Sequence, residues 1–336
     1  MQTRAVDAYA PPNTRQWTPT HRPRTEGSYA SEVTVPLSIS AVVETALGAG
    51  KPVVALESTI ISHGLPRPDN LAAAREFEAI LSDMGVVPAT IAVLDGQLKA
   101  GLTDDELVRI AGEDIPKLSV RDLPVVLARG GSGATTVAAT SYIAHLAGIG
   151  VFATGGLGGV HVGAAETFDE SADLTVLSRV PITVVSAGVK SILDIPATLE
   201  RLESLGVIVL GYGTDAFPGF WLTDSGQRLD WSVHGPDEVA EVIALRDELG
   251  QSAAILVANP LPAAEQLDPA IHDEALREAL SMAEAQGLTG KEVTPFLLQS
   301  IVGLTGGESL AVNLRIAANN IRVAGQIAQS SARRTG

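Results

Sequence analysis

Residues 151–194 read VFATGGLGGVHVGAAETFDESADLTVLSRVPITVVSAGVKSILD. This stretch contains two short apolar runs, with a glycine-rich turn and a longer helix-like segment between them. Apolar strands that alternate with helical segments are typical of a mainly parallel sheet covered by helices. This part of the chain therefore predicts an α/β fold.

The same alternation extends along the rest of the chain. It begins near Leu37, and after Pro269 almost the whole sequence has a helical pattern. Asp95-Gly96 predicts a tight turn, so part of the sheet is expected to be an antiparallel hairpin. We expect a single α/β domain with a mixed, mostly parallel central sheet between helices (αβα) and a helical C-terminal region. The candidate strands are Val53–Leu56, Thr90–Leu94, Val151–Ala153, Ile182–Val185, Val207–Leu210 and Ala254–Val257.

Helix ends can be predicted at two places. Asp69 is a candidate N-cap of a helix that runs to Met84 and stops at Gly85. Thr103 and Glu106 have the spacing of a capping box, so a second helix is expected to begin there.

The N-terminal segment differs in composition from the rest. It is rich in Pro, Thr and Arg, has no hydrophobic period, and lacks the apolar region of a secretory signal. We predict a disordered leader at residues 1–38, the α/β domain at 39–330 and a flexible tail at 331–336. An organellar transit peptide is the alternative interpretation of the leader.

Composition limits the classes of function. The 336 residues are 46% hydrophobic and 18% charged, which is ample for one large domain with a buried core. The net charge of −16 argues against nucleic acid or an anionic membrane as a partner. The sequence has no cysteine, which excludes disulfides and thiolate sites, and no apolar run reaches the length of a membrane span. A cytoplasmic enzyme that acts on a small molecule is the expectation.

Two ionisable residues follow predicted strands, where an α/β fold usually places its chemistry. Glu57 follows the run VVAL, and burial there would raise its pKa and suit it to act as a general acid. Lys190 follows ITVVSAG and is expected to enter the next helix. Burial beside a helix start would favour an uncharged amine, the form that makes a Schiff base. The alternative is a surface ion pair between Lys190 and Asp194.

The loops also contain groups that could bind an anion or a metal ion. The glycines of 130–133 and 155–159 would let backbone N–H groups approach a phosphate closely. The carboxylates of Asp169 and Asp173 suit a hard divalent ion. Alternatively, the glycines serve close packing, the two carboxylates cap turns, and His161 is an ordinary loop histidine.

Long runs of the sequence resemble the pseudouridine-5′-phosphate glycosidase family, which includes the indigoidine synthase A-like proteins. The resemblance covers essentially the whole predicted domain, with the motifs in the same order and at similar spacing. The matching runs are ALESTIISHG (55–64), PATIAVLDG (88–96), KLSVRDLP (117–124), GATTVAAT (133–140), VFATGGLGGVH (151–161), TFDESADL (167–174), AGVKSILD (187–194), VANPLP (257–262), GKEVTPFLL (290–298) and LTGGESLAVNL (304–314).

The resemblance implies cleavage of the C–C bond between C1′ of ribose 5-phosphate and C5 of uracil. It implies that Lys190 holds C1′ of the opened ribose as an imine and that Glu57 is the proton donor. It also implies one Mn²⁺ per subunit, held by Asp169 and water, and a homotrimer. The substrate-contact positions that it implies are Lys117, Val137, Thr154, Gly155, Gly156, His161, Ser171, Ala172, Asp173 and Asn313.

The sequence departs from the family pattern in two motifs. Val162 and Ala165 replace an arginine and a carboxylate, and Val120 stands where arginine is common. A lost guanidinium near an anion would remove one or two charge-assisted hydrogen bonds unless Arg121 or Lys117 compensates. These departures affect how the phosphate and the base are expected to be bound.

The expected function is reversible cleavage of pseudouridine 5′-phosphate to uracil and ribose 5-phosphate. The main alternative is a C-glycosynthase that joins ribose 5-phosphate to a non-uracil acceptor. A sugar kinase is suggested only loosely by DSGQ and TGGES, and a non-catalytic sugar-phosphate-binding protein would form no covalent adduct.

Overall fold

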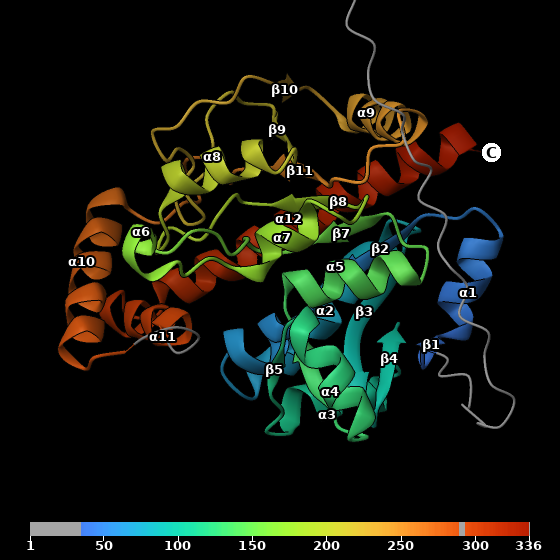
Figure 1. The fold of residues 1–336 in the computed structure, drawn as a ribbon, viewed down its shortest axis with the longest axis horizontal. Helices are drawn as coiled ribbons and strands as arrows, with labels where there is room; N and C mark the ends of the chain where they lie inside the picture. Colours follow the sequence, from blue (N-terminus) through green and yellow to red (C-terminus); the bar gives the residue numbers. More distant parts are fainter. Residues whose placement is uncertain (1–34, 289–292, 336) are drawn as a thin grey trace, which may run out of the picture. The chain divides into compact units, whose positions relative to one another are not determined.

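The computed structural model describes residues 35–288 and 293–335 (Figure 1). Residues 36–335 are built around an eleven-stranded sheet whose main path runs β1-β4-β3-β2-β7-β8-β11-β9-β10, with β6 pairing to β3 and β5 to β6. The strands are β1 (Leu37–Ile39), β2 (Val53–Leu56), β3 (Val87–Leu94), β4 (Gln97–Ala100), β5 (Lys117–Leu118), β6 (Gly133–Thr135), β7 (Val151–Ala153), β8 (Thr183–Ser186), β9 (Ile208–Tyr212), β10 (Ser232–Val233) and β11 (Ile255–Ala258).

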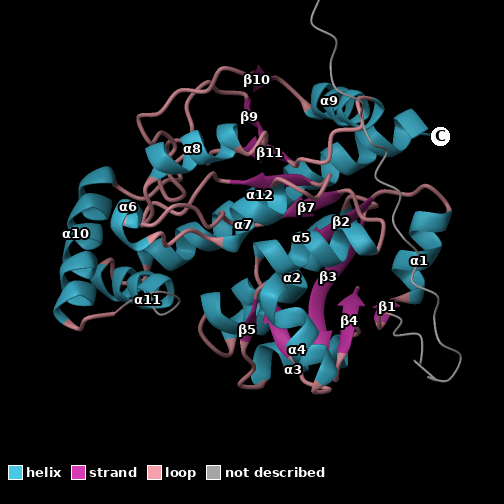
Figure 2. Cartoon of the chain, in the orientation of Figure 1, coloured by secondary structure: helices cyan, strands magenta, loops and turns pink. Residues whose placement is uncertain are grey.

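Helices cover both faces of the sheet, so the predicted αβα arrangement is confirmed (Figure 2). They are α1 (Ala41–Gly48), α2 (Asp69–Asp83), α3 (Asp104–Gly112), α4 (Leu123–Ala128), α5 (Val137–Leu146), α6 (Ala164–Thr167), α7 (Ala172–Leu177), α8 (Ile195–Ser204), α9 (Pro236–Glu248), α10 (Pro269–Ala285), α11 (Val293–Leu304) and α12 (Glu308–Thr335), with a π-helical turn, η1 (Ile60–Gly64), and a 3₁₀ turn, η2 (Val120–Asp122).

Most strand pairs are parallel, as predicted. The exceptions among the named strands are β3–β4 and β3–β6, which are antiparallel. Asp95 and Gly96 join β3 to β4 with φ angles of 50° and 74°, the left-handed pair that a two-residue hairpin requires. A side chain at position 96 would lie 2.8 Å from the Cα of Gly130, so this turn also requires a glycine for close packing.

The central strands are buried on both faces, which explains their continuous apolar runs. In β2, Val53 and Ala55 pack into one core, shared with α5 and α7. Val54 and Leu56 point to the opposite face, into a second core with α2 and α12. This alternation follows from the two-residue period of a strand.

Several predicted boundaries are corrected by the structure. Asp69 is the first residue of α2 rather than its N-cap, which is Pro68, whereas the capping box of Thr103 and Glu106 is confirmed. Three of the predicted strands, at 182–185, 207–210 and 254–257, begin one residue later.

The predicted chain ends also differ from the structure where it describes them. β1 contains residues that were assigned to the leader, and its pairing with β4 makes it part of the sheet. Residues 1–34 lie outside the described residues. The predicted tail is helical as far as Thr335, since α12 continues there and Arg333 donates to Asp237 of α9.

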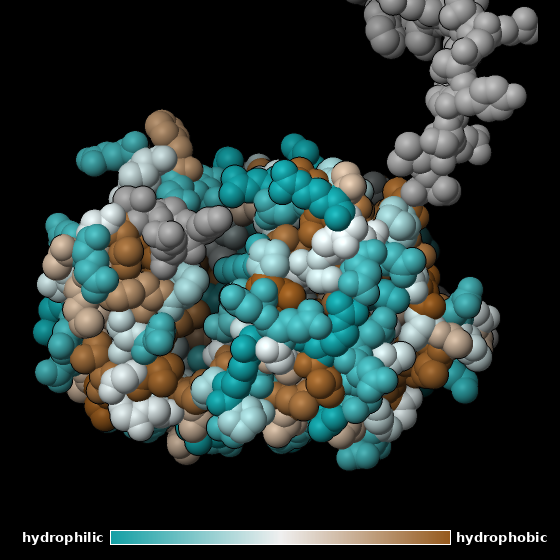
Figure 3. Space-filling view, turned by 90° about the horizontal axis from the view of Figure 1, so that it is seen from below, coloured by the Kyte–Doolittle hydropathy of each residue, from teal (hydrophilic) through white to brown (hydrophobic). Residues whose placement is uncertain are grey.

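The surface drawn in Figure 3 mixes hydrophilic and hydrophobic side chains among its described residues. Over residues 35–288 and 293–335, no helix has the length and apolar character needed to cross a membrane.

Candidate active site

A cavity of about 470 Å³ lies at the carboxyl ends of β2, β7 and β8, which are neighbours in the sheet. Glu57 follows β2, Gly155 and Gly156 follow β7, and Lys190 follows β8. This is the edge at which α/β folds place ligands. The lining is completed by η1 and the loop after it, by β5, and by α11 and α12; the residues are Glu57, Thr59, Ile60, His63, Gly64, Leu65, Pro66, Lys117, Gly155, Gly156, Lys190, Phe220, Thr294, Pro295, Leu298, Gln299, Val302, Leu310 and Asn313.

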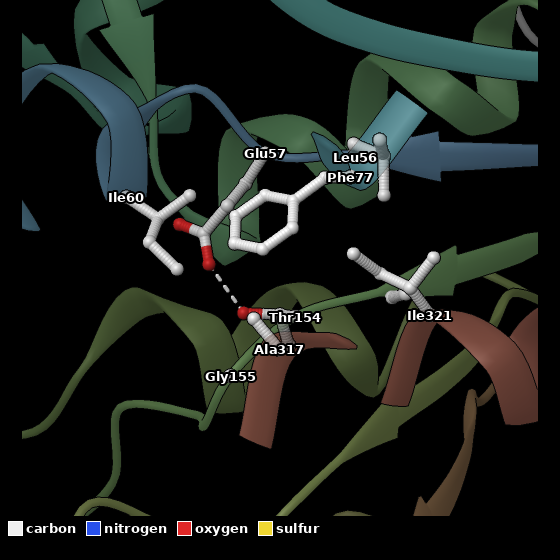
Figure 4. A pocket seen from close by; sticks show the side chains of 9 residues that line it. Leu56, Glu57, Ile60, Phe77, Thr154, Gly155, Ala317 and Ile321 are labelled. Carbon is white, nitrogen blue, oxygen red and sulfur yellow. Dashed lines mark hydrogen bonds between the residues drawn. The ribbon is translucent and has the colours of Figure 1, made fainter. Parts of the chain in front are cut away.

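Glu57 has the environment that the sequence predicted for it. Its carboxyl group points toward Thr154, whose hydroxyl donates a short hydrogen bond to Oε1, and apolar side chains surround the pair (Figure 4). A void of only about 20 Å³, lined by residues such as Phe77 and Ile321, lies beside it. Burial raises the pKa of Glu57, although the charge of Lys190 and the Thr154 hydrogen bond act in the opposite direction.

Lys190 lines the same cavity, but it is not part of a helix. Its Nζ donates to the carbonyl oxygen of Gly156 at 2.9 Å, so the amine faces the glycine loop. The following helix, α8, begins at Ile195, and Asp194 is its N-cap, accepting from the Ala197 N–H at 3.0 Å. The predicted helix start at Lys190 is therefore wrong, and the alternative of an ion pair with Asp194 is replaced by this cap.

The loop that contains Lys190 is fixed to the glycine loop by backbone hydrogen bonds. The Lys190 N–H donates to Leu157 at 3.1 Å, and the Leu157 N–H donates to Gly188 at 3.0 Å. Gly188 has a φ of 72°, and a side chain there would overlap the carbonyl oxygen of Pro218. The backbone of the loop at Lys190 is thus fixed by these hydrogen bonds and by the close packing at Gly188.

A second amine, that of Lys117, lines the cavity from β5. The side chain is accessible to solvent through the cavity, yet the surrounding protein and the charge of Lys190 lower the pKa of Lys117. Asp173 and Glu57 act in the opposite direction. The side chains of Lys117 and Lys190 and the Glu57 carboxyl group, whose pKa is raised, therefore interact electrostatically at one end of the cavity.

The glycine loop after β7 has two parts with different surroundings. Gly155 and Gly156 line the cavity, and a side chain at position 156 would lie 2.6 Å from the Phe220 ring. Gly158 and Gly159 face away from it, because side chains there would overlap Ser171 and Thr198. Close packing thus explains the second pair of glycines, and an approach to a ligand is open to the first pair.

Four of the predicted substrate-contact residues lie behind the glycine loop. Asp173 accepts from the Gly158 N–H at 2.8 Å and from the Ala138 N–H at 2.9 Å, and it is 6% exposed. Ser171 is the N-cap of α7, Ala172 is its first residue, and Val137 is the first residue of α5 and is buried. Asp173 and Ser171 are bonded to the glycine loop, and contact of any of the four residues with substrate stays a prediction.

His161 and Asp169 lie together on the loop around α6. The His161 Nδ1 is 4.0 Å from Asp169 Oδ2, and the His161 N–H donates to the Asp169 carbonyl oxygen at 3.0 Å. Among the described residues no group of three or more His, Asp or Glu side chains could hold a metal ion together. A divalent ion held by Asp169 would therefore take most of its ligands from water or from the substrate, as hydrated hard ions do.

The two remaining predicted side chains are Asn313, which belongs to α12, and Thr154, which is hydrogen-bonded to α12. Asn313 lines the cavity, and its Oδ1 is buried with no hydrogen-bond partner among the described residues. Thr154 is held by Asn320, which the sequence analysis did not single out; the Asn320 amide donates to the Thr154 carbonyl oxygen at 2.7 Å.

Sequence reasoning also missed His63 and Gln299 in the cavity wall. His63 lies 2.6 Å from the Ser62 hydroxyl through its Nδ1, and its surroundings together with the Lys117 charge lower the pKa of its imidazole. His63 follows the motif ESTIIS, so its place near Glu57 could have been noticed. Gln299 has no comparable signal, because α11 meets the cavity only through tertiary packing.

The three departures from the family pattern lie outside the cavity wall. Val162 is 64% exposed on the loop before α6, and Ala165 is exposed beside it. Val120 begins η2, and the adjacent Arg121 is exposed and lies 3.8 Å from Asp122. Of the two cations that could compensate for a missing arginine, only Lys117 lines the cavity.

The α/β fold thus brings a lysine and a desolvated carboxyl group to one cavity. The chain belongs to the family of indigoidine synthase A like proteins, whose family model matches residues 42–330.

Relatives with known names support this assignment. A protein of Salinispora tropica named pseudouridine-5′-phosphate glycosidase is 61% identical over 294 residues, which are 87% of this chain and 91% of that protein. A protein of Streptomyces griseus with the same name is 56% identical over 88% of this chain and 92% of its own length. The crystal structure of the prealnumycin C-glycosynthase AlnA in complex with ribulose 5-phosphate has a TM-score of 0.83 and 36% identity, covering 89% of this chain and 98% of that one.

Proposed function

We propose that this enzyme is a pseudouridine-5′-phosphate glycosidase, which converts pseudouridine 5′-phosphate and water reversibly to uracil and ribose 5-phosphate. The observation that carries the proposal is the meeting of Lys190 and Glu57 in one cavity, in a chain 61% identical to a relative of that name. A C–C glycosidic bond does not break by the usual two-carboxylate route, because the base would leave as a carbanion. A lysine nucleophile and a proton donor overcome this difficulty together.

In the proposed reaction the Lys190 amine bonds to C1′ of the ribose as the bond between C1′ and the ring oxygen breaks, and the proton that the amine loses goes to this oxygen, which becomes a hydroxyl of the opened sugar. Glu57 then gives its proton to C5 of the base. The electron pair on the lysine nitrogen forms a protonated imine as the C1′–C5 bond breaks, the two electrons of that bond pass to the base, which leaves as neutral uracil, and the proton on the imine returns to Glu57. Water hydrolyses the imine, which releases ribose 5-phosphate and the free amine.

The surroundings support these roles. The raised pKa of Glu57 favours the protonated acid that this step requires. The amine of Lys190 donates to a backbone carbonyl rather than to a carboxylate, so no ion pair with the protein has to be broken before it reacts. Lys117, Gly155 and Gly156 are the groups that we assign to the anionic end of the substrate.

We assign the side-chain amide of Asn313, which lines the cavity, to the base. Uracil carries N–H donors and carbonyl acceptors, with which an amide can form hydrogen bonds. The base would lie against the apolar wall formed by Leu298, Val302 and Leu310.

We further propose that one Mn²⁺ per subunit is held by Asp169, that the enzyme is a homotrimer, and that it is cytoplasmic. A hard divalent ion fits a single carboxylate with water ligands and would neutralise charge on a bound phosphate.

The assay that tests the function uses purified enzyme, Mn²⁺ and pseudouridine 5′-phosphate. We expect uracil and ribose 5-phosphate to appear in equal amounts, and we expect pseudouridine 5′-phosphate to form when these two products are supplied instead. No interconversion in either direction would overturn the proposal. Product formed only with another acceptor would favour the C-glycosynthase alternative, which the structural similarity to AlnA keeps as the second candidate.

A further inference from the structure

A hydrogen-bonded chain of three side chains lies next to the nucleophilic lysine. The hydroxyl of Ser191, the residue after Lys190, lies 2.8 Å from His272 Nε2. The His272 Nδ1 lies 3.0 Å from Asp273 Oδ1. Because an ionised carboxylate only accepts, Nδ1 is assigned as the donor to Asp273, and in the corresponding neutral tautomer Nε2 accepts the Ser191 hydroxyl proton.

This arrangement resembles the relay of a hydrolase in its order, but it has no access to a substrate. The residues that line the described cavity include neither Ser191 nor His272. His272 is only 4% exposed, and its ring packs edge-on against Trp221 with centroids 6.0 Å apart. Any effect of these side chains on the reaction is therefore indirect, through the residues that do line the cavity.

The three side chains connect two parts of the cavity wall. His272 and Asp273 belong to α10, which packs on α11, and α11 contributes Leu298, Gln299 and other residues to the wall. Ser191 belongs to the loop after β8 that carries the nucleophile. Apart from the hydrogen bond between Ser191 and His272, the loop that carries Lys190 is held mainly by its backbone hydrogen bonds to the glycine loop.

We propose that His272 is a positioning residue, which holds the Lys190 loop against α10 through Ser191 so that the amine stays at the cavity. The proposal rests on the proposed function, since it assigns His272 a role in presenting that nucleophile. A small displacement of a reacting group lowers the rate of a step without preventing substrate binding, so the effect belongs in kcat rather than in KM.

Four variants test this role. His272→Ala and Ser191→Ala each remove the bond, and Ser191→Ala deletes only one oxygen, so it remains informative if the larger deletion unfolds the protein. The double variant tests whether the two residues act through one another. His272→Gln keeps an amide near the position of Nε2 that can still bond Ser191, and His145→Ala, at an exposed position of α5, is the matched control.

We expect His272→Ala and Ser191→Ala each to lower kcat about 10-fold, with KM changed by less than about 2-fold. The double variant should be no worse than either single one, because both remove the same contact. His272→Gln should recover most of the activity, and His145→Ala should match the wild type. Unchanged kcat in both single variants, or additive losses in the double variant, would overturn the proposal.

Amide hydrogen exchange provides a readout that needs no turnover. Exchange in the segment 191–194 should become faster in His272→Ala and Ser191→Ala, and stay as in the wild type in His145→Ala. If the wild type cleaves no pseudouridine 5′-phosphate, the proposed function fails. Unchanged exchange in both variants would separately overturn the role of His272 in holding the Lys190 loop.

Discussion

The carboxyl group of Glu57 is subject to opposing influences. Burial raises its pKa, and the nearby charge of Asp173 acts in the same direction, whereas Lys190, Lys117 and the Thr154 hydroxyl lower it; the net direction is upward. The apolar neighbours in Figure 4 explain why burial is the largest of these influences. The protonated form of Glu57 is therefore favoured more in this site than it would be in water.

Replacing Glu57 by Gln tests this at the level of one residue. We expect kcat to fall by about 10²–10⁴, because the amide has no proton to give, while the Thr154 hydrogen bond can still form. A carboxyl group with a raised pKa stabilises the fold at pH values below its unfolded-state pKa, and this contribution is lost as the pH rises through the folded-state pKa. Glu57→Gln should therefore unfold at a higher temperature than the wild type at alkaline pH and at the same temperature at acidic pH.

Glu78 offers a matched control for the stability measurement. Burial raises its pKa too, and it accepts from the Thr90 hydroxyl, but it lies on α2 and does not line the cavity. Glu78→Gln should show the same dependence of unfolding temperature on pH with unchanged kcat. If Glu57→Gln kept full activity, the role of proton donor would be wrong.

The proposed metal site can be tested by replacing Asp169. We expect chelation to abolish activity, Mn²⁺ to restore it, and Asp169→Asn to weaken Mn²⁺ binding by at least about 10-fold, because the described residues contain no group of three or more His, Asp or Glu side chains that could hold the ion instead. Titration calorimetry with Mn²⁺ alone gives the affinity without relying on turnover. Equal Mn²⁺ affinity in Asp169→Asn and wild type would remove Asp169 from the metal site.

At the level of elements, the apolar runs predicted the strands well. Their alternation between two cores fixes the register of β2, β7 and β8, and with it the meeting of Glu57, Gly155 and Lys190 at one edge. The sequence did not predict that Lys190 lies in a loop, because the turn before α8 is held by bonds to the distant glycine loop. Local patterns do not contain such long-range pairing.

The substitution Gly188→Ala tests how closely the loop that carries Lys190 is packed. Its φ of 72° and the overlap with Pro218 predict that Gly188→Ala lowers the free energy of unfolding by more than about 2 kcal/mol. Gly85→Ala is the control, since Gly85 has a φ of 74° but open space around it, and should cost about 1 kcal/mol. Urea unfolding measures both, and equal costs would show that packing at Gly188 contributes nothing.

At the level of the whole molecule, the sequence indicated one edge of the sheet but not the cavity. Lining residues such as His63, Gln299 and Phe220 come from segments far apart in the chain, and only packing brings them together. The resemblance named Asp173 and Val137 as substrate contacts, which stays a prediction; the structure shows in addition that Asp173 accepts from the glycine loop and that Val137 begins α5. A position in a motif does not distinguish contact with a ligand from support of a neighbour.

The predicted trimer is also a property of the whole molecule. On the loop around α6, Phe168 is 85% exposed and Val162 is 64% exposed, which are the kinds of side chain that a subunit interface buries. We expect light scattering to give three times the 34.7 kDa of one chain. The mass of a single chain at micromolar concentration would contradict the trimer.

The central claim is that the amine of Lys190 bonds covalently to the sugar. Enzyme incubated with ribose 5-phosphate and then reduced with borohydride should gain the mass of one reduced sugar phosphate, and peptide mass spectrometry should place it on Lys190. Lys190→Ala should gain nothing. An adduct on Lys117, the other lysine among the described lining residues, or no adduct at all in active enzyme, would contradict this claim.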